Sequence, residues 1–298
     1  MRIIINNLSI LFSIIFLFSC NTDDDDTLEN QSKLALITDF KVAHNNVFIN
    51  AYIDDKSSTI LLEVPNDLSI NSISPKISTS INASVHPKSG ESINLNNSAI
   101  YTVTAENGDK KEYKINMYTK NLLINPRGEN NGANWEFTNK TNAGIEKNSK
   151  GENIFYIIQQ DDGRNETISQ NISLSRDYSN KYILFIGDMT TEKVVNKSIT
   201  RHPYFWGLQK GDFSSDIEPI DQVIQSGMMH DEEANVWQVV SGTHLLLPNV
   251  NEIYFQIGQA SMVGDPNDGT KSMCKDIEVR IFQSKQDAEI YVSKLYRS

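Results

Sequence analysis

The sequence predicts an all-β protein in which two β-sandwich modules follow one another along the chain. Short apolar runs alternate with polar residues, and no helical period competes with them over residues 36–118. Turn sequences such as Asn107-Gly108 separate neighbouring runs. A chain of 298 residues is also long enough for two domains of ordinary size.

The first 19 residues have the form of a signal peptide. Arg2 supplies a positive start, and an apolar run covers residues 10–18. At a helical rise of about 1.5 Å per residue this run spans roughly 14 Å, about half of a ~30 Å hydrocarbon core. We therefore expect no transmembrane helix here.

The end of this run resembles the lipobox of bacterial lipoproteins. It reads Leu-Phe-Ser-Cys over residues 17–20, with Phe18 bulkier than is usual before the small residue. The resemblance implies cleavage before Cys20 and lipid on that cysteine, which would hold the chain to a membrane.

Residues 20–34 are expected to form a tether. Four successive aspartates, residues 23–26, repel one another and favour an extended, solvated segment. Their position resembles the acidic export signal of surface lipoproteins of the Bacteroidetes type. This resemblance implies a lipid-anchored, surface-exposed protein of the outer membrane.

Composition excludes one class of partner. The net charge is −11, and no basic cluster with interleaved aromatic residues occurs, so nucleic-acid binding lacks its electrostatic driving force. Only two cysteines are present. If Cys20 carries lipid, Cys274 has no partner in the chain, and the modules must fold without a disulfide.

The first module is predicted over residues 35–119. Its clearest signal is a hairpin in which Asn107-Gly108 joins two alternating runs. The expected inward side chains are Tyr101, Val103, Tyr113, Ile115 and Met117. The first strand of this hairpin is expected at residues 99–105, and other strands are expected at residues 40–42, 47–49, 60–64 and 77–81.

Four pieces of this module resemble a small immunoglobulin-like or cadherin-like domain of unknown function that recurs near the N-terminus of such lipoproteins. These pieces are residues 64–65, 73–75, 83–90 and 101–108. The resemblance implies a spacer that lifts the next module off the membrane.

The second module is predicted over residues 120–284. Residues 121–129 read Asn-Leu-Leu-Ile-Asn-Pro-Arg-Gly-Glu, and Trp135 follows. This opening resembles the first strand of galactose-binding-like jelly rolls, which include many carbohydrate-binding modules, and also the F-box-associated domain. Later strands are expected at residues 168–172, 182–188, 253–257 and 277–282. Residues 285–298 predict one short helix with Ala288, Tyr291, Val292 and Leu295 on its inner face.

No familiar catalytic motif occurs in the sequence, which predicts that the protein is not an enzyme. Two acidic clusters leave a hydrolase open: Asp161-Asp162 with Glu166, and residues 230–233. Both clusters lie among polar residues and are expected to be solvated loop charges.

Consecutive aromatic residues give the strongest indication of a binding surface. Alternation in a strand places Tyr204 and Trp206 on one face and Phe205 on the other. A face with exposed rings beside polar groups suits sugars, because sugars present both C–H faces and hydroxyls. Packing in the core is the competing interpretation. His202 and Asp268 are the other candidate ligand contacts.

One departure weakens the resemblance to glycan binders. The sugar-binding F-box-associated domains carry aromatic residues before the last strand, whereas residues 271–276 here contain none. The jelly-roll resemblance also implies a structural calcium ion held by Glu129 and Asp276. Calcium prefers six to eight oxygen ligands, so backbone carbonyls and water would complete the shell.

These features together predict a non-catalytic surface lipoprotein that binds glycan through its second module. Two alternatives stay open: a structural or adhesion subunit that binds a surface protein, and a hydrolase that uses the acidic loops.

Overall fold

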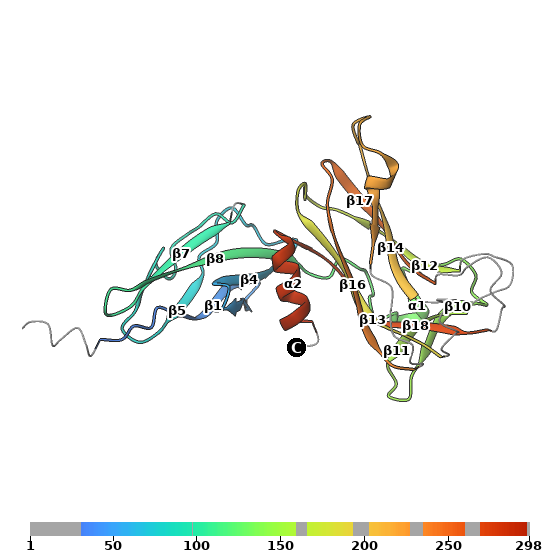
Figure 1. Ribbon diagram of the computed structural model, residues 1–298, viewed down its shortest axis with the longest axis horizontal. Coiled ribbons are helices and arrows are strands. Elements are labelled where there is room, and N and C mark those ends of the chain that lie inside the picture. The colour runs from blue at the N-terminus through green and yellow to red at the C-terminus, as the bar shows by residue number, and fades with distance from the viewer. Residues whose placement is uncertain are drawn as a thin grey trace, which may run out of the picture.

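The computed structural model describes residues 31–96, 98–158, 166–192, 203–226, 235–259 and 269–296. It shows an all-β protein with two bodies side by side and one helix between them (Figure 1). The predicted all-β class is therefore confirmed. His202, Asp268 and Cys20 lie outside the described residues, as do the acidic residues 161–162 and 230–233.

The first body packs two sheets around one hydrophobic cluster that runs from Ala35 to Ile115. One sheet has the order β2-β1-β5, and the other contains β3, β4, β8, β7 and β6. The strands are β1 (Ile37–His44), β2 (Val47–Asn50), β3 (Tyr52–Asp54), β4 (Thr59–Val64), β5 (Lys76–Thr79), β6 (Ser84–His86), β7 (Ala99–Thr104) and β8 (Lys110–Thr119).

The predicted hairpin is confirmed as the pair β7 and β8. Tyr101 pairs with Tyr113 in an antiparallel register, and Gly108 has the positive φ of 89° that the turn requires. Tyr101, Val103, Tyr113 and Ile115 are fully or almost fully buried, which follows from the alternation in the sequence.

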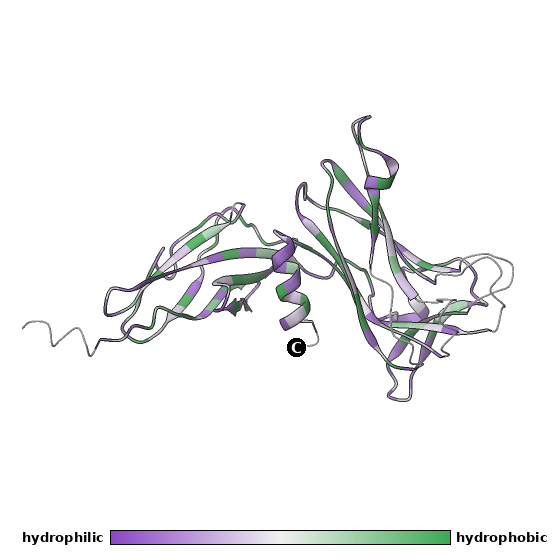
Figure 2. Ribbon diagram, in the orientation of Figure 1, coloured by the Kyte–Doolittle hydropathy of each residue, from purple (hydrophilic) through white to green (hydrophobic). Residues whose placement is uncertain are grey.

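The second body also packs two sheets. One has the order β10-β11-β18-β13-β16, and the other has the order β15-β14-β17-β12-β9. Alternating hydrophilic and hydrophobic residues along these strands accompany the burial of one face of each sheet (Figure 2). The strands are β9 (Glu136–Phe137), β10 (Ala143–Lys147), β11 (Asn153–Ile158), β12 (Thr167–Ser173), β13 (Tyr182–Thr191), β14 (Pro203–Gly211), β15 (Val223–Gln225), β16 (Gln238–Leu245), β17 (Val250–Gln259) and β18 (Lys271–Phe282).

The opening of the second module is not a strand, contrary to the sequence prediction. Residues 121–128 are irregular and lead into the short turn α1 (Glu129–Gly132). Side chains there bond to the backbone in place of a sheet ladder: Asn121 accepts from Leu123 N at 3.2 Å, and Asn125 accepts from Glu129 N at 2.7 Å.

The helix α2 (Lys285–Lys294) begins at Ser284, whose hydroxyl accepts a hydrogen bond from Asp287 N. Ala288 and Tyr291 are buried, and Val292 and Leu295 pack against the same cluster, so the predicted inner face is confirmed. Within the described ranges, no helix is long and apolar enough to cross a membrane. A 3-10 turn, η1 (Pro219–Gln222), precedes β15.

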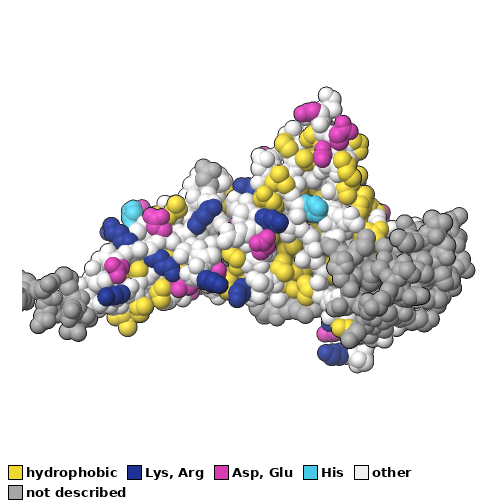
Figure 3. All heavy atoms as spheres, viewed as in Figure 1, with side chains coloured by type: hydrophobic (Ala, Val, Ile, Leu, Met, Phe, Trp, Pro, Cys, Tyr) yellow, Lys and Arg dark blue, Asp and Glu magenta, His cyan; other side chains and the backbone are white. Residues whose placement is uncertain are grey.

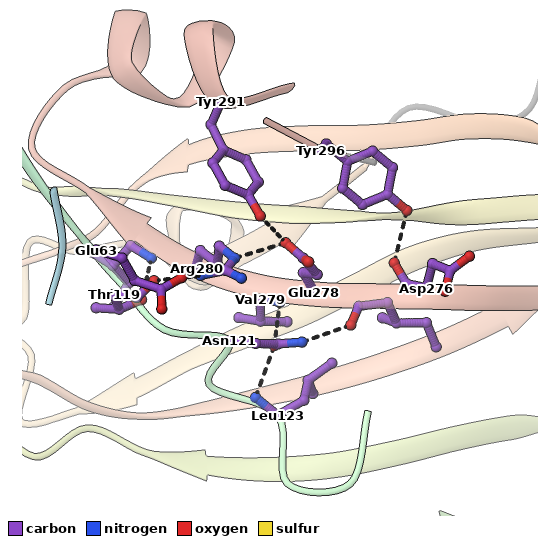
Figure 4. A network of polar contacts seen from close by, with 12 residues as sticks. Glu63, Thr119, Asn121, Leu123, Asp276, Glu278, Val279, Arg280, Tyr291 and Tyr296 are labelled. Atoms are coloured by element: carbon purple, nitrogen blue, oxygen red, sulfur yellow. Dashed lines mark hydrogen bonds and ion pairs between the residues drawn. The ribbon is translucent and has the colours of Figure 1, made fainter. Parts of the chain in front are cut away.

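The two bodies share a strand pairing, in which Phe282 of β18 lies beside Tyr118 of β8. Arg280 reinforces this junction from the second body (Figure 4): its guanidinium donates to Glu63 at 2.7 Å, to Thr119 O at 2.9 Å and to Glu278 at 2.7 Å. We call this set, completed by Phe282 and Tyr118, the module junction.

Candidate functional site

The strand β14 shows the predicted alternation. Phe205 is fully buried and its ring centroid lies 5.4 Å from that of Phe255 in the core. Tyr204 and Trp206 are half-buried on the opposite, outer face of the sheet. The structure therefore separates the three consecutive aromatics into one core residue and two surface residues.

A third ring joins them from the neighbouring strand. Tyr254 on β17 is also half-buried on the outer face, and its ring lies edge-on to Trp206 with centroids 6.1 Å apart. We call Tyr204, Trp206 and Tyr254 the aromatic face. Alternation around Ile253 and Phe255 would have indicated that Tyr254 points outward, but only the pairing of β14 with β17 brings it to Trp206.

Tyr204 owes its position to a glycine on the adjacent strand. It pairs with Gly258, where an added Cβ would lie 2.8 Å from the ring carbon Cζ of Tyr204. The ring thus occupies the space that a side chain at position 258 would need. Partial burial raises the pKa of the Tyr204 hydroxyl, so this group stays protonated and can donate a hydrogen bond at neutral pH.

Polar side chains surround the rings. The Tyr254 hydroxyl donates to Gln256 Oε1 at 3.2 Å, next to Trp206 in the register. Lys210 lies 5.6 Å from the centroid of the Tyr254 ring and donates to Glu252 at 2.7 Å and to Asn171 at 3.0 Å. Rings flanked by amide and carboxylate groups can receive both the C–H face and the hydroxyls of a sugar.

The two predicted calcium ligands line one cavity of about 450 Å³. Glu152 lines the same cavity as Glu129 and Asp276, and carboxylate oxygens of this kind are suitable calcium ligands. Lys275 lies 3.4 Å from Glu152 and 3.6 Å from Asp276, so an ammonium group already stands beside two of these carboxylates.

Cations balance the carboxylates of this cavity, because Arg127 and Lys147 line it as well as Lys275. In the part of the chain that the structure describes, no group of three acidic, His or Cys side chains is arranged to hold a metal ion. The calcium ion therefore stays a prediction, and Lys275 is the residue with which it would compete.

Glu166 differs from its prediction as a solvated loop charge. It is 6% exposed, and the amides of Asn139 and Asn142 donate to its Oε1 at 3.3 and 3.4 Å. Its place directly before β12 puts it on the side of Ile168, which faces the core. The polar residues around Glu166 in the sequence do not indicate that its side chain is buried.

Charge on the visible surface is dispersed. Lys and Arg side chains lie among Asp and Glu side chains over the first body, without an extended patch of one sign (Figure 3). This distribution agrees with the absence of a basic cluster in the sequence.

Comparison with known proteins gives one match to a family. Residues 37–117 match the model described as "SGBP, N-terminal", where SGBP stands for surface glycan-binding protein. The match covers the first body only. No curated protein matches the chain.

Several solved structures resemble the chain at low identity. A proposed glycoside hydrolase from Bacteroides thetaiotaomicron has a TM-score of 0.37 and 12% identity, covering 82% of this chain and 95% of that chain. The xylan-binding CBM22-1 domain of Paenibacillus barcinonensis Xyn10C has a TM-score of 0.37 and 11% identity, covering 55% and 96%. TmCBM61 in complex with β-1,4-galactotriose has a TM-score of 0.35 and 12% identity, covering 54% and 97%.

Proposed function

We propose that this chain is a non-catalytic surface protein that binds glycan across the aromatic face. The observation that carries the proposal is the set of three half-buried rings, Tyr204, Trp206 and Tyr254, beside Gln256 and other polar side chains on the outer face of a sheet. The match of residues 37–117 to the N-terminal family of surface glycan-binding proteins supports it.

Flat rings contribute to sugar affinity without needing a deep pocket. A sheet face holds its side chains at fixed spacings, so it suits an extended chain of sugar units rather than a single buried one. The partners in this proposal are glycans, with the first body acting as the spacer.

The direct test is a glycan array with the full chain, followed by titration of each bound glycan with two adjacent variants. We expect Trp206→Ala to weaken binding by about 1 to 2 kcal/mol because one stacked ring is lost, with the fold retained. Phe205→Ala is the matched control, and it should cost ~3 to 5 kcal/mol of unfolding free energy because Phe205 is a core residue.

A Trp206→Ala protein that unfolds, or that binds every glycan as tightly as the wild type, would contradict the aromatic face as the site. An array on which no glycan binds would instead favour a surface protein as the partner.

We further propose that lipid on Cys20 anchors the protein to the outer membrane and that residues 20–34 form its tether. The lipobox resemblance and the four aspartates support this proposal. Cys20→Ala should leave the protein in the aqueous phase of a detergent partition, whereas Cys274→Ala, which changes the buried cysteine, should not alter the partition. Equal partition of wild type and Cys20→Ala into detergent would refute lipidation.

A further inference from the structure

A pocket of about 260 Å³ lies at the module junction, and none of the residues of the aromatic face lines it. Both bodies contribute to its apolar lining, with Val64, Ile70 and Met117 from the first, and Tyr178 and Phe282 from the second. Ligand pockets usually span about 300 to 1,000 Å³, so this volume limits an occupant to about one small ring.

Two cations line the same pocket. Arg176 donates from Nη2 to the backbone oxygen of Asn66 at 3.0 Å, and Lys181 donates from Nζ to Gln283 Oε1 at 2.6 Å. Both acceptors are uncharged. Over the described residues neither cation forms an ion pair, although the protein as a whole carries a net charge of −11.

The lining of this pocket contains one carboxylate, that of Asp177, and it already accepts hydrogen bonds from a neighbouring residue. Asp177 accepts hydrogen bonds from the backbone nitrogen and the hydroxyl of Ser179, and these bonds, with the nearby Lys181, hold the pKa of Asp177 below its usual range. Its negative charge therefore offsets one of the two cations, which leaves a net positive lining.

We propose that this pocket binds a single carboxylate-bearing sugar ring, a hexuronate. A guanidinium has five N–H donors and an ammonium has three, so Arg176 and Lys181 each keep donors for a carboxylate after their present bonds are counted. Hydrogen bonds between ionised groups are about twice as strong as those between neutral groups. The apolar lining receives the C–H face of the ring, and Gln283 and Asn96 offer amides to its hydroxyls.

The ring has two sources with the same chemistry: a free sugar acid, or the end of a glycan. The pocket shares no lining residue with the aromatic face, so it is a separate candidate site.

The test is isothermal titration of the full chain with sodium glucuronate, with glucose as the uncharged analogue. We expect glucuronate to bind at least about tenfold more tightly than glucose, which corresponds to about 1.4 kcal/mol. Lys181→Gln and Arg176→Gln should each remove most of this preference. Lys56→Gln, which removes one positive charge from an exposed turn of the first body, should retain it.

Lys181→Gln keeps the contact from Arg176 to Asn66, so a loss of preference in this variant does not arise from the loss of that contact. Glucuronate and glucose that bind equally, glucuronate that does not bind at millimolar concentration, or variants that keep the preference would each overturn the proposal. An oligosaccharide with a terminal uronate separates the sources: comparable or tighter binding assigns the pocket to a glycan end, and binding of the free acid alone assigns it to a sugar acid.

Discussion

At the residue scale, the absence of a side chain at Gly258 determines where an aromatic ring can lie. The space over the backbone of β17 is filled by Tyr204 from β14. Because carbon atoms do not pack at 2.8 Å, a methyl group at position 258 would move the tyrosine ring away from its present place. The geometry of the aromatic face thus depends on one residue that contributes no side chain to it.

A second single-residue effect concerns the buried hydroxyl of Tyr101. Among the described residues nothing hydrogen-bonds to it, and burial raises the pKa of Tyr101 to about 12. We expect Tyr101→Phe to be neutral or to stabilise the protein by about 1 kcal/mol, because an unsatisfied buried hydroxyl is removed. Urea unfolding at pH 8 measures this difference.

The raised pKa of Tyr101 also predicts how the free energy of unfolding changes at alkaline pH. Burial disfavours the charged phenolate, so the unfolded state ionises near pH 10 while the folded state does not, and the protein loses stability as the pH rises toward 12. Tyr101→Phe should therefore lose less stability than the wild type between pH 8 and pH 11. Tyr113→Phe is the matched control: Tyr113 donates to Asp55, so its removal should destabilise the protein at pH 8. A Tyr101→Phe protein less stable than the wild type at pH 8 would contradict this account.

At the element scale, the local sequence pattern predicts where the strands lie, but it does not predict which strands pair with one another. The hairpin of β7 and β8 and the two faces of β14 follow from alternation within a few residues. The parallel pairing of β4 with β8 joins segments far apart in sequence, and no local pattern encodes it. Residues 121–128 do not form the predicted strand, because the side chains of Asn121 and Asn125 accept hydrogen bonds from backbone nitrogens that would otherwise pair with a neighbouring strand.

The candidate site was predictable to the same extent. Tyr204 and Trp206 were visible as consecutive aromatics with alternating orientation. Tyr254 was not, because its proximity to Trp206 depends on which strand lies beside β14. The sequence predicts Glu166 to be a solvated loop charge, because its polar neighbours in the sequence do not indicate burial. In the structure the amides of Asn139 and Asn142 donate to its carboxylate.

The strand β18 also carries an irregularity that sets the lining of the cavity. Its pairing with β13 shifts register between Ile186 and Asp188, and Asp276 opposite has a φ of 50°. Such a bulge interrupts alternation and redirects side chains. Both Lys275 and Asp276 line the cavity as a result, which strict alternation would not allow.

This cavity yields a test of the predicted calcium ion. Lys275 stands where it competes with a divalent cation for Glu152 and Asp276. Calcium should therefore raise the melting midpoint of Lys275→Gln more than that of the wild type, and Glu129→Gln should reduce the increase. Thermal melts with calcium and with chelator measure this, with Glu112→Gln, an exposed carboxylate of the first body, as the control. Midpoints that respond to neither addition in any variant would remove calcium from the cavity.

At the scale of the whole molecule, the two bodies are joined by more than a linker. A shared strand pairing, the stacked rings of Tyr118 and Phe282 with centroids 5.3 Å apart, and the bonds of Arg280 to Glu63 and Thr119 all cross the module junction. Buried contacts that span two cores couple their unfolding, so the chain should unfold as one unit.

Arg280→Met should break this coupling. It removes the cation between Glu63 and Glu278, whose side chains are 31% and 23% exposed. Loss of one partner from a fully buried pair costs about 3 to 5 kcal/mol, so we expect about 2 to 3 kcal/mol here. All three tryptophans lie in the second body, so tryptophan fluorescence reports that body alone. Fluorescence and circular dichroism should give coincident transitions for the wild type and separate ones for Arg280→Met.

Arg127→Met is the control, because Arg127 has an exposed side chain away from the junction. An Arg280→Met protein with the same midpoint as the wild type would show that the junction does not couple the bodies.

The position of the junction residues in the chain has a consequence during biosynthesis. Arg280 reaches back 217 residues to Glu63, and Asp287 reaches back 171 residues to Asn116, so the closing contacts are among the last to be translated. All members of the cluster from Ala35 to Ile115 belong to the first body, so they are translated before Arg280 and Asp287. In a polypeptide cut short before residue 280, Glu63 would lack its counterion and the ring of Tyr118 would lack the cover of Phe282 and Tyr291. A protease or a chaperone would therefore meet exposed residues on a truncated product that are covered in the finished protein.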